Sequence, residues 1–327
     1  MLTAPFRFDE LGPGRIVHHR AGVKGPYIVP FSDNAMSSGD ADAPFITSIF
    51  HPSDFSEASE VAFAHALKAA LVAGSRLTLF HVSPDMTARW SDFPGVREML
   101  EQWGLVPPGS DRSAVVALGI DVRKIIMPER NPVSSVLRYL EREPADLIVL
   151  AAHRHDDATD WLRKSVAAPV ARLSGEATLF VPHGVEGFVS RRDGALSLER
   201  ILIPVAATPK AQPALTAAAR LVSRLSCATG VFTLLHVGAA GDMPGVNRPQ
   251  VSGWQWDSVT KDGDVIDTIL DTARTTKADL IVMTTDGRNG FLDALRGSHS
   301  ERLLPRSPCP LLVIPETASG TQALTRD

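Results

Sequence analysis

The segment FITSIFHPSDFSEASEVAFAHALKAALVAGSRLTLFHVSP, residues 45–84, is the most informative part of the sequence, because a second version of it occurs later in the chain. The second version is LERILIPVAATPKAQPALTAAARLVSRLSCATGVFTLLHVGA, residues 198–239. Both copies also end alike, with ADLIVLAAHR from Ala145 and ADLIVMTTDG from Ala278. A repeat of this length indicates two copies of one domain, so each candidate functional residue can be compared with its twin.

The copies differ in length between their second and third strands. Paired residues are 155 positions apart at His81 and His236 but 133 apart at Leu147 and Leu280, so the second copy lacks 22 residues. The first copy has VREMLEQWG there, residues 96–104, which predicts a short helix. The second has GAAGDMPGVNRPQVSG, which predicts an open loop and less cover for its site.

Composition limits the function classes. The chain is 44% hydrophobic and 21% charged with a net charge of −4, and it has no Lys/Arg-rich run, which argues against nucleic-acid binding. No apolar stretch approaches the ~18 residues of a membrane span, and the first residues lack a secretory pattern. Cys227 and Cys309 form neither a disulfide framework nor a metal-ligand spacing. We expect a cytoplasmic protein without a membrane partner.

The repeat divides the chain. We assign an N-terminal extension and linker at 1–43, a first domain at 44–183, a linker at 184–197, a second domain at 198–316 and a tail at 317–327. Within the extension, RIVHH and YIVPF predict a short hairpin.

Within each copy, apolar runs alternate with helical segments. Ser56 is predicted to begin the first helix and Gly74 to end it. In the second copy, Thr208 with Pro209 is predicted to begin the matching helix and Gly230 to end it. This alternation predicts an α/β fold with a doubly wound parallel sheet in each copy. Ligands of such sheets bind beyond the carboxyl ends of the strands, where the strand order reverses.

Four motifs resemble the universal stress protein family. They are HPSDFSEAS after the first strand, LFHV on the second, ADLIVM before a glycine-containing loop, and GSHSERLLPRSPCPLLVIP at the end. The resemblance covers nearly all of 44–183 and 197–316 and is to a tandem member. It implies two Rossmann-like domains of the adenine-nucleotide alpha-hydrolase type, which form an internal pseudo-dimer through their last strands.

The resemblance also implies a phosphate loop, Gly-x2-Gly-x9-Gly-Ser/Thr, whose glycines let backbone N–H groups approach phosphate oxygens. In the second copy, Gly287, Gly297 and Ser298 match this loop, while Thr284 replaces its first glycine. His299 follows and completes the candidate ATP-binding loop.

In ATP-binding members an Asp after the first strand and a Val on the second hold adenine and ribose. The second copy has Pro204 and Val237 at matching positions, but Ala206 stands where the Asp is expected. Its nucleotide would therefore lack one carboxylate contact.

The first copy shows the reverse pattern. Pro52, Asp54 and Val82 match the adenine–ribose side, but its loop has no motif glycine. Arg154 and Lys164 stand in that loop and bring positive charge. We weigh the first copy as the weaker nucleotide site.

Each assignment has a structural alternative. Ser298 and Glu301 fit a helix capping box, the two loop glycines fit turn geometry, and Asp54 fits a helix-entry turn. The HRHDD run at 153–157 has the composition of a metal site but is predicted to be a solvated loop, so no metal site is assigned.

Three functions remain. The favoured one is a regulatory protein, not an enzyme, that binds ATP or another adenine nucleotide, with Mg²⁺ near Asp286 and Asp293, and responds through protein partners or a further homo-oligomer. The alternative is a stress-related interaction scaffold whose sites have decayed. A nucleotide hydrolase is less favoured, because the Walker, Gly-x-Gly-x-x-Gly and Gly-x-Ser-x-Gly motifs are absent.

Overall fold

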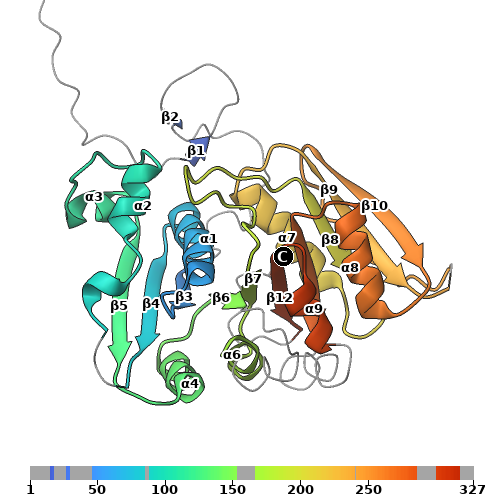
Figure 1. The fold of residues 1–327 in the computed structure, drawn as a ribbon. Helices are drawn as coiled ribbons and strands as arrows, with labels where there is room; N and C mark the ends of the chain where they lie inside the picture. Colours follow the sequence, from blue (N-terminus) through green and yellow to red (C-terminus); the bar gives the residue numbers. More distant parts are fainter. Residues whose placement is uncertain are drawn as a thin grey trace, which may run out of the picture.

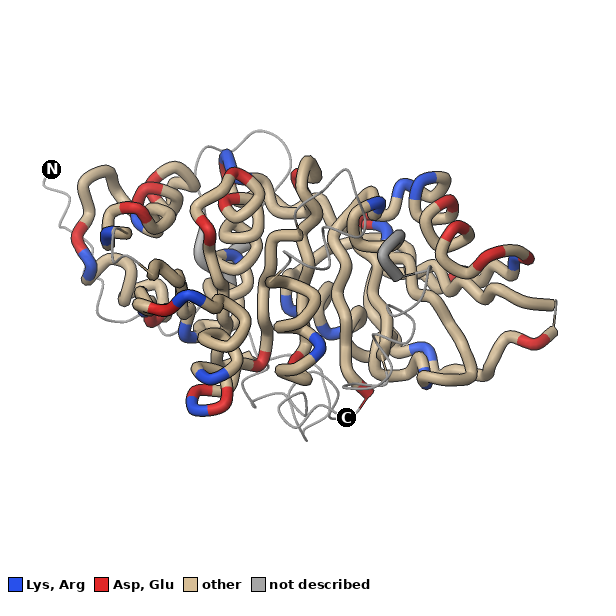
Figure 2. Tube along the Cα trace, turned by 60° about the horizontal axis from the view of Figure 1, so that its bottom comes forward, with Lys and Arg blue, Asp and Glu red and all other residues tan. Residues whose placement is uncertain are grey.

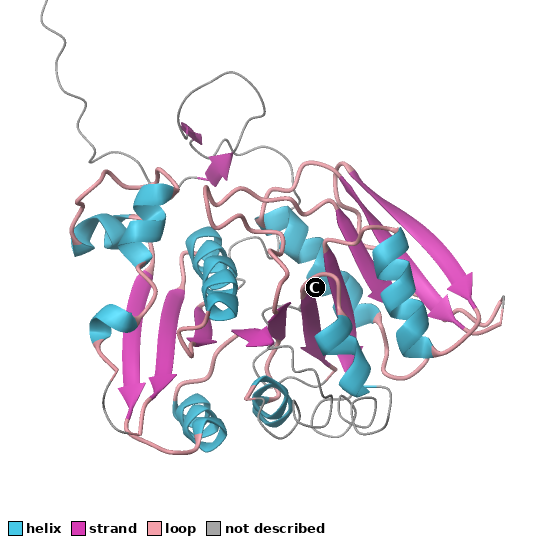
Figure 3. Ribbon diagram, in the orientation of Figure 1, coloured by secondary structure: helices cyan, strands magenta, loops and turns pink. Residues whose placement is uncertain are grey.

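A computed structural model describes residues 15–17, 27–29, 46–84, 88–152, 166–239, 241–285 and 300–316, with the backbone alone for 15–17, 27–29 and 300–302. Within these ranges the long strands form one ten-stranded sheet with helices on both faces (Figures 1 and 3). A separate antiparallel pair joins β1 (Arg15–Val17) and β2 (Tyr27–Val29). The hairpin predicted in the N-terminal extension is therefore confirmed.

The first copy contributes five strands to the sheet. They are β3 (Ser48–Pro52), β4 (Arg76–Val82), β5 (Asp121–Met127), β6 (Leu147–Ala152) and β7 (Thr178–Pro182). Its α-helices among the described residues are α1 (Glu57–Ala73), α2 (Val96–Gln102), α3 (Arg112–Ala117), α4 (Pro132–Arg142) and α6 (Ala167–Ser174).

The second copy repeats the pattern with fewer helices in its described part. Its strands are β8 (Arg200–Pro204), β9 (Gly230–Val237), β10 (Trp254–Lys261), β11 (Leu280–Thr285) and β12 (Leu311–Pro315). Its helices are α7 (Gln212–Arg224), α8 (Val265–Thr275) and α9 (Ser300–Arg306).

The strand order of the sheet is β10-β9-β8-β11-β12-β7-β6-β3-β4-β5. Neighbours within each copy run parallel, while β12 and β7 meet antiparallel, with Leu311 opposite Phe180 (Figure 1). The predicted fold of two tandem doubly wound domains in an internal pseudo-dimer is confirmed. The pairing removes one exposed edge from each domain, and unpaired edges favour unwanted association.

The two faces of the sheet carry separate apolar cores. Side chains of α1 and α7 share one core with inward-facing residues of both copies. Side chains of α4, α6, α8 and α9 share the other. Because each core contains residues of both copies, the two domains are packed as one body across β7 and β12.

In the first copy, helix α1 begins and ends at the capping residues that the sequence predicted. Ser56 caps α1 by accepting a hydrogen bond from the Ser59 backbone N–H, and Gly74 ends the helix with φ of 58°. In the second copy the expectation was wrong. Helix α7 begins at Gln212 rather than at Pro209, and Gly230 is the first residue of β9 rather than a helix end.

The length difference between the copies has the expected consequence. Helix α2 lies in the first copy where a short helix was predicted, while residues 241–253 form no helix. The Gln212 side-chain amide holds this loop by donating to the Asn247 carbonyl at 3.0 Å and accepting from its N–H at 2.9 Å. The indole of Trp256 donates to the Pro249 carbonyl, which fastens the same loop to β10.

Charged residues gather along the helices and outer turns, with both signs interspersed (Figure 2). A binder of nucleic acid usually concentrates Lys and Arg on one face instead.

Candidate functional site

The doubly wound topology places one reversal of strand order in each domain. Strand β3 lies between β4 and β6, and β8 lies between β9 and β11, so the strand order reverses at β3 and at β8. The carboxyl ends of these strands are where ligands of open α/β sheets bind. The described residues of both candidate sites lie at these two edges.

In the first domain, Pro52 is the last residue of β3 and Val82 the last of β4. The His81 Nδ1–H donates to the Ser53 carbonyl at 2.7 Å, which ties the end of β4 to the loop that follows β3. Phe55 stacks on the His81 ring with 4.0 Å between centroids. The structure thus brings together the residues assigned to the adenine–ribose side.

Asp54 is engaged locally. One of its carboxylate oxygens accepts hydrogen bonds from the Ser56 backbone N–H at 3.0 Å and from the Ser56 hydroxyl at 2.6 Å. Because Ser56 is the cap of α1, this carboxylate orients the start of the helix. The helix-entry alternative therefore describes a contact that Asp54 makes.

In the second domain, Pro204 ends β8 and Val237 ends β9. The His236 Nδ1–H donates to the Val205 carbonyl at 3.0 Å, which repeats the bond made by His81 in the first domain. Ala206, at the position of the expected Asp, is exposed. The twin histidines thus hold the same loop in both copies, while the carboxylate of Asp54 and the ring of Phe55 are replaced by Ala206 and Ala207 in the second.

Thr284 has a role that its place in the loop motif did not predict. It is 5% exposed on β11, and its hydroxyl accepts a hydrogen bond from the Ala214 backbone N–H at 3.2 Å. Helix α7 has no side-chain cap of its own at Ala211, so a strand residue 70 positions away supplies the missing oxygen. The matching residue of the first copy, Ala151, is not needed as a helix cap, because Ser56 caps α1.

We predict that Thr284→Val lowers the free energy of unfolding by about 1 kcal/mol, because a capping oxygen is lost while the Ala214 N–H keeps its bond to the Ala211 carbonyl. Thr285→Val is the matched control. Thr285 is equally buried, but its hydroxyl bonds to no residue that the structure describes. Urea unfolding of both variants measures the difference, and equal stabilities would rule out the cap.

The remaining loop residues predicted for the site lie outside the described residues. These are Gly287, Gly297, Ser298 and His299, together with Asp286, Asp293 and the Arg154 and Lys164 of the first copy. Glu301 has a described backbone only, so the capping box stays a prediction as well.

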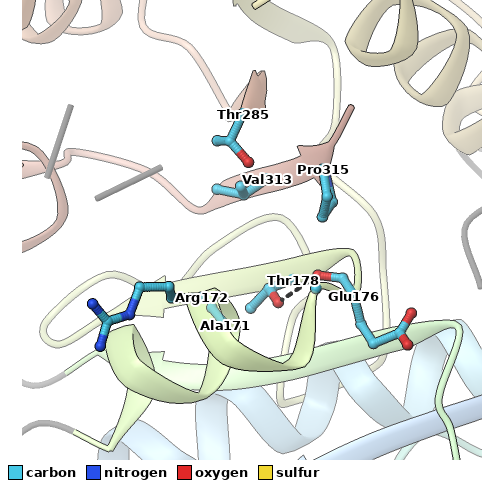
Figure 4. Close-up of a pocket in the computed structure, with 8 residues that line it drawn as sticks. Ala171, Arg172, Glu176, Thr178, Thr285, Val313 and Pro315 are labelled. Atoms are coloured by element: carbon cyan, nitrogen blue, oxygen red, sulfur yellow. Dashed lines mark hydrogen bonds between the residues drawn. The ribbon is translucent and has the colours of Figure 1, made fainter. Parts of the chain in front are cut away.

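A small cavity of about 10 Å³ lies where the two domains meet, beside the end of β11 (Figure 4). Arg172 and Glu176 of the first domain and Thr285 and Pro315 of the second line it. Burial, with a smaller contribution from the charge of Asp146, raises the pKa of Glu176 to about 7. The space is that of about one water, so this cavity does not hold a nucleotide.

Two further observations limit the chemistry. Among the described residues, no group of three or more His, Cys, Asp or Glu side chains is placed to hold a metal ion. Within the same residues, no helix is long and apolar enough to cross a membrane.

Comparisons with known proteins show which family and which solved structures the chain resembles. The model of the universal stress protein family matches residues 47–182 and 249–315. A universal stress protein structure from Archaeoglobus fulgidus DSM 4304 has a TM-score of 0.56 and 20% identity, covering 83% of this chain and 96% of that one. A candidate universal stress protein from Pseudomonas aeruginosa UCBPP-PA14 has a TM-score of 0.52 and 14% identity, covering 83% and 93%.

A third structure is that of the universal stress protein from Archaeoglobus fulgidus in complex with dAMP. It is 17% identical, with a TM-score of 0.29, and covers 41% of this chain and 96% of its own. No curated protein matches the chain. The structural likenesses show the fold alone, but the family model covers more than half of the sequence in both copies, and the chain therefore belongs to the universal stress protein family.

Proposed function

We propose that this universal stress protein is a non-enzymatic regulator that binds an adenine nucleotide, ATP with Mg²⁺, at the carboxyl edge of its second domain. Nucleotide occupancy then changes its association with protein partners in the cytoplasm. The observation that carries the proposal is the position of Pro204, Val237 and Thr284 at or next to the carboxyl ends of three neighbouring strands, where the strand order reverses at β8. The loop with two motif glycines follows directly after this point.

The strand pairings support this arrangement. Pro204 of β8 is paired with Leu235 of β9, two residues before Val237. On the other side of β8, Ile201 and Leu202 pair with Leu280 and Ile281 of β11. The ends of the three strands therefore form one edge, at which the predicted phosphate loop leaves β11.

The second domain is a better candidate than the first for two reasons. The first-domain loop contains no motif glycine, so a side chain occupies each position where a phosphate would need the backbone to approach closely. In addition, Asp54 already orients the start of α1. We propose the first domain as the weaker site, held by Pro52, Asp54 and Val82.

Isothermal titration with Mg-ATP tests the proposal. Wild-type protein should bind saturably, and Gly297→Asp should weaken binding by about 100-fold or more, because it adds a negative charge against the phosphates. Asp54→Ala should retain the binding of the second domain. A measurement of association, such as a change in the mass of the protein's complexes when nucleotide is added, tests the regulatory part of the proposal.

Ala228→Asp is the control for the added charge. Ala228 is exposed and lies before the first residue of β9, at the opposite edge of the sheet, so the net charge changes equally without touching the site. Equal affinity of wild type and Gly297→Asp would contradict the phosphate-loop assignment. No heat of binding to the wild type would contradict the proposal as a whole.

The scaffold function is the second candidate, and a specific observation favours it. The antiparallel pairing of β7 with β12 builds both copies into one sheet whose outer strands are β5 and β10. Such a body presents a long, rigid surface whether or not a nucleotide is bound. Absence of nucleotide binding together with capture of a defined partner would favour this function.

A further inference from the structure

A second cavity, of about 40 Å³, lies between the domains on the face of the sheet covered by α1 and α7. Ala69 of α1 and Ala217 and Leu221 of α7 line its walls. Leu179 of β7 and Leu312 of β12 also line it, as does Phe188 of the linker, whose side of the cavity is called the roof below. The lining is therefore almost entirely apolar and belongs to both copies.

The roof of this cavity is held in place by a buried histidine. The His65 Nδ1–H donates to the Val61 carbonyl at 2.8 Å, so its Nε2 carries a lone pair. That Nε2 accepts hydrogen bonds from the backbone N–H groups of Phe188 at 3.1 Å and Val189 at 3.3 Å. The Phe188 ring also packs edge-on against His65, with 4.7 Å between centroids. The cavity is thus preformed, since its roof does not depend on a ligand.

Among the described residues that line this cavity, Lys68 is the one with a cationic side chain. It is 6% exposed, and its ammonium lies 5.8 Å from the centroid of the Trp103 ring. It makes no hydrogen bond or ion pair with any residue that the structure describes, and burial lowers its pKa despite the more distant charge of Asp193. Burial of most of this side chain removes water from around the ammonium, which has no ion-pair partner among the described residues, and an anion beside it would offset the cost of that desolvation.

We infer that this interdomain cavity binds a small aliphatic carboxylate, whose hydrocarbon chain lies among the leucine and alanine side chains and whose carboxylate pairs with Lys68. Charge complementarity selects the anion, and the apolar lining selects the chain. The site is separate from the proposed nucleotide site, which lies at the carboxyl edge of β8. Because both domains line it, its occupancy bears on how they pack together.

The size of the cavity limits the ligand. One water needs roughly 10–15 Å³ of such space, so the cavity has room for about three or four methylene groups. Each methylene buried should raise affinity about fourfold until the space is filled. Affinity should therefore increase from acetate through butanoate to hexanoate, and increase little from hexanoate to octanoate.

Ligand-observed NMR titration of the full-length protein with these four carboxylates tests the inference. Hexanoate should bind saturably, and hexan-1-ol, which lacks the charge, should bind about tenfold more weakly. Lys68→Met should remove the preference for hexanoate over hexanol, and Ala69→Leu should weaken both ligands by filling the cavity. The chain-length series needs no variant, so it remains decisive if a substitution unfolds the protein.

Lys124→Met is the matched control, because Lys124 also lies over an aromatic ring, 5.6 Å from the Phe93 centroid, but outside this cavity. It should bind hexanoate as the wild type does. Unchanged hexanoate affinity in Lys68→Met, or no saturable binding of any chain length at tens of millimolar, would overturn the inference.

Discussion

Acidification from pH 6.5 to pH 4 should destabilise this protein strongly through two buried histidines. Burial lowers the pKa of His51 and of His65 from 6.5 to about 4. The folded state therefore binds fewer protons than the unfolded state between these pH values. The stability that the neutral rings contribute is complete above pH 6.5 and is lost as the pH falls towards 4, by about 3 kcal/mol for each histidine.

The surroundings of both rings explain why protonation is unfavourable. His51 is 0% exposed on β3, its Nδ1–H donates to the Val149 carbonyl at 2.9 Å, and its Nε2 has no partner among the described residues. In His65 the Nε2 is an acceptor for two backbone N–H groups of the linker. A proton on that atom would replace two hydrogen bonds with two repulsive contacts, so acid should loosen the linker as well as the core.

Urea unfolding at a series of pH values measures the effect. His65→Gln keeps a donor and an acceptor but does not titrate, and His51→Leu removes the second ring. Each single variant should reduce the change in the free energy of unfolding between pH 6.5 and pH 4 by about half. The double variant should remove most of this change. A double variant with the pH dependence of the wild type would contradict the assignment.

The comparison of variants is needed because Glu176 acts in the opposite direction. Its pKa is raised to about 7, so the folded state favours the protonated carboxyl, and this contribution grows as the pH falls from 7 to 4.5. Glu176 is partly exposed, which reduces its effect. It is the same in wild type and histidine variants and cancels from their difference.

The second large effect is expected at Gly187 in the linker. Its φ is +73°, and a Cβ would lie closer to the His65 ring than van der Waals contact permits and 3.3 Å from Pro310 Cγ. The His65 ring has no room to retreat, since both of its nitrogens are hydrogen-bonded. Gly187→Ala should lower the free energy of unfolding by about 3 kcal/mol, from backbone strain and disturbed linker hydrogen bonds.

Gly184→Ala is the matched control in the same linker. Gly184 has nearly the same φ, +76°, but a Cβ there would meet nothing within 4 Å. Gly184→Ala should lower the free energy of unfolding by about 1 kcal/mol, which is the contribution of backbone strain alone. Thermal and urea unfolding of both variants give the comparison, and equal losses would show that the contact with His65 is unimportant.

Much of the fold could be predicted because its signals are local. The apolar runs at Ile201–Ile203 and Leu280–Thr284, and the cap at Ser56, are readable within a few residues, since strands and helix ends are stabilised by nearby groups. The helix start predicted at Thr208 with Pro209 was wrong. These residues are a typical start signal, but the helix begins three residues after Pro209, at Gln212.

The candidate site was less predictable. Pro204 and Val237 were assigned to strand ends and lie there, and Asp54 lies in the loop after β3 as expected, but the cap that Thr284 provides for α7 could not be inferred. That bond joins residues 70 positions apart, and a threonine in a glycine motif gives no sign of which way its hydroxyl turns.

The repeat and the alternation of strands and helices could therefore be read from the sequence, because each copy carries the same local pattern. The pairing of the last strands was implied only by the resemblance to the family. How the linker is held and where the interdomain cavity lies became evident from the three-dimensional structure alone. His65 and Phe188 are 123 residues apart, and Lys68 lines a space that exists only when α1, α7, β7 and β12 meet. Such contacts depend on the packing of both domains at once, and no local pattern encodes them.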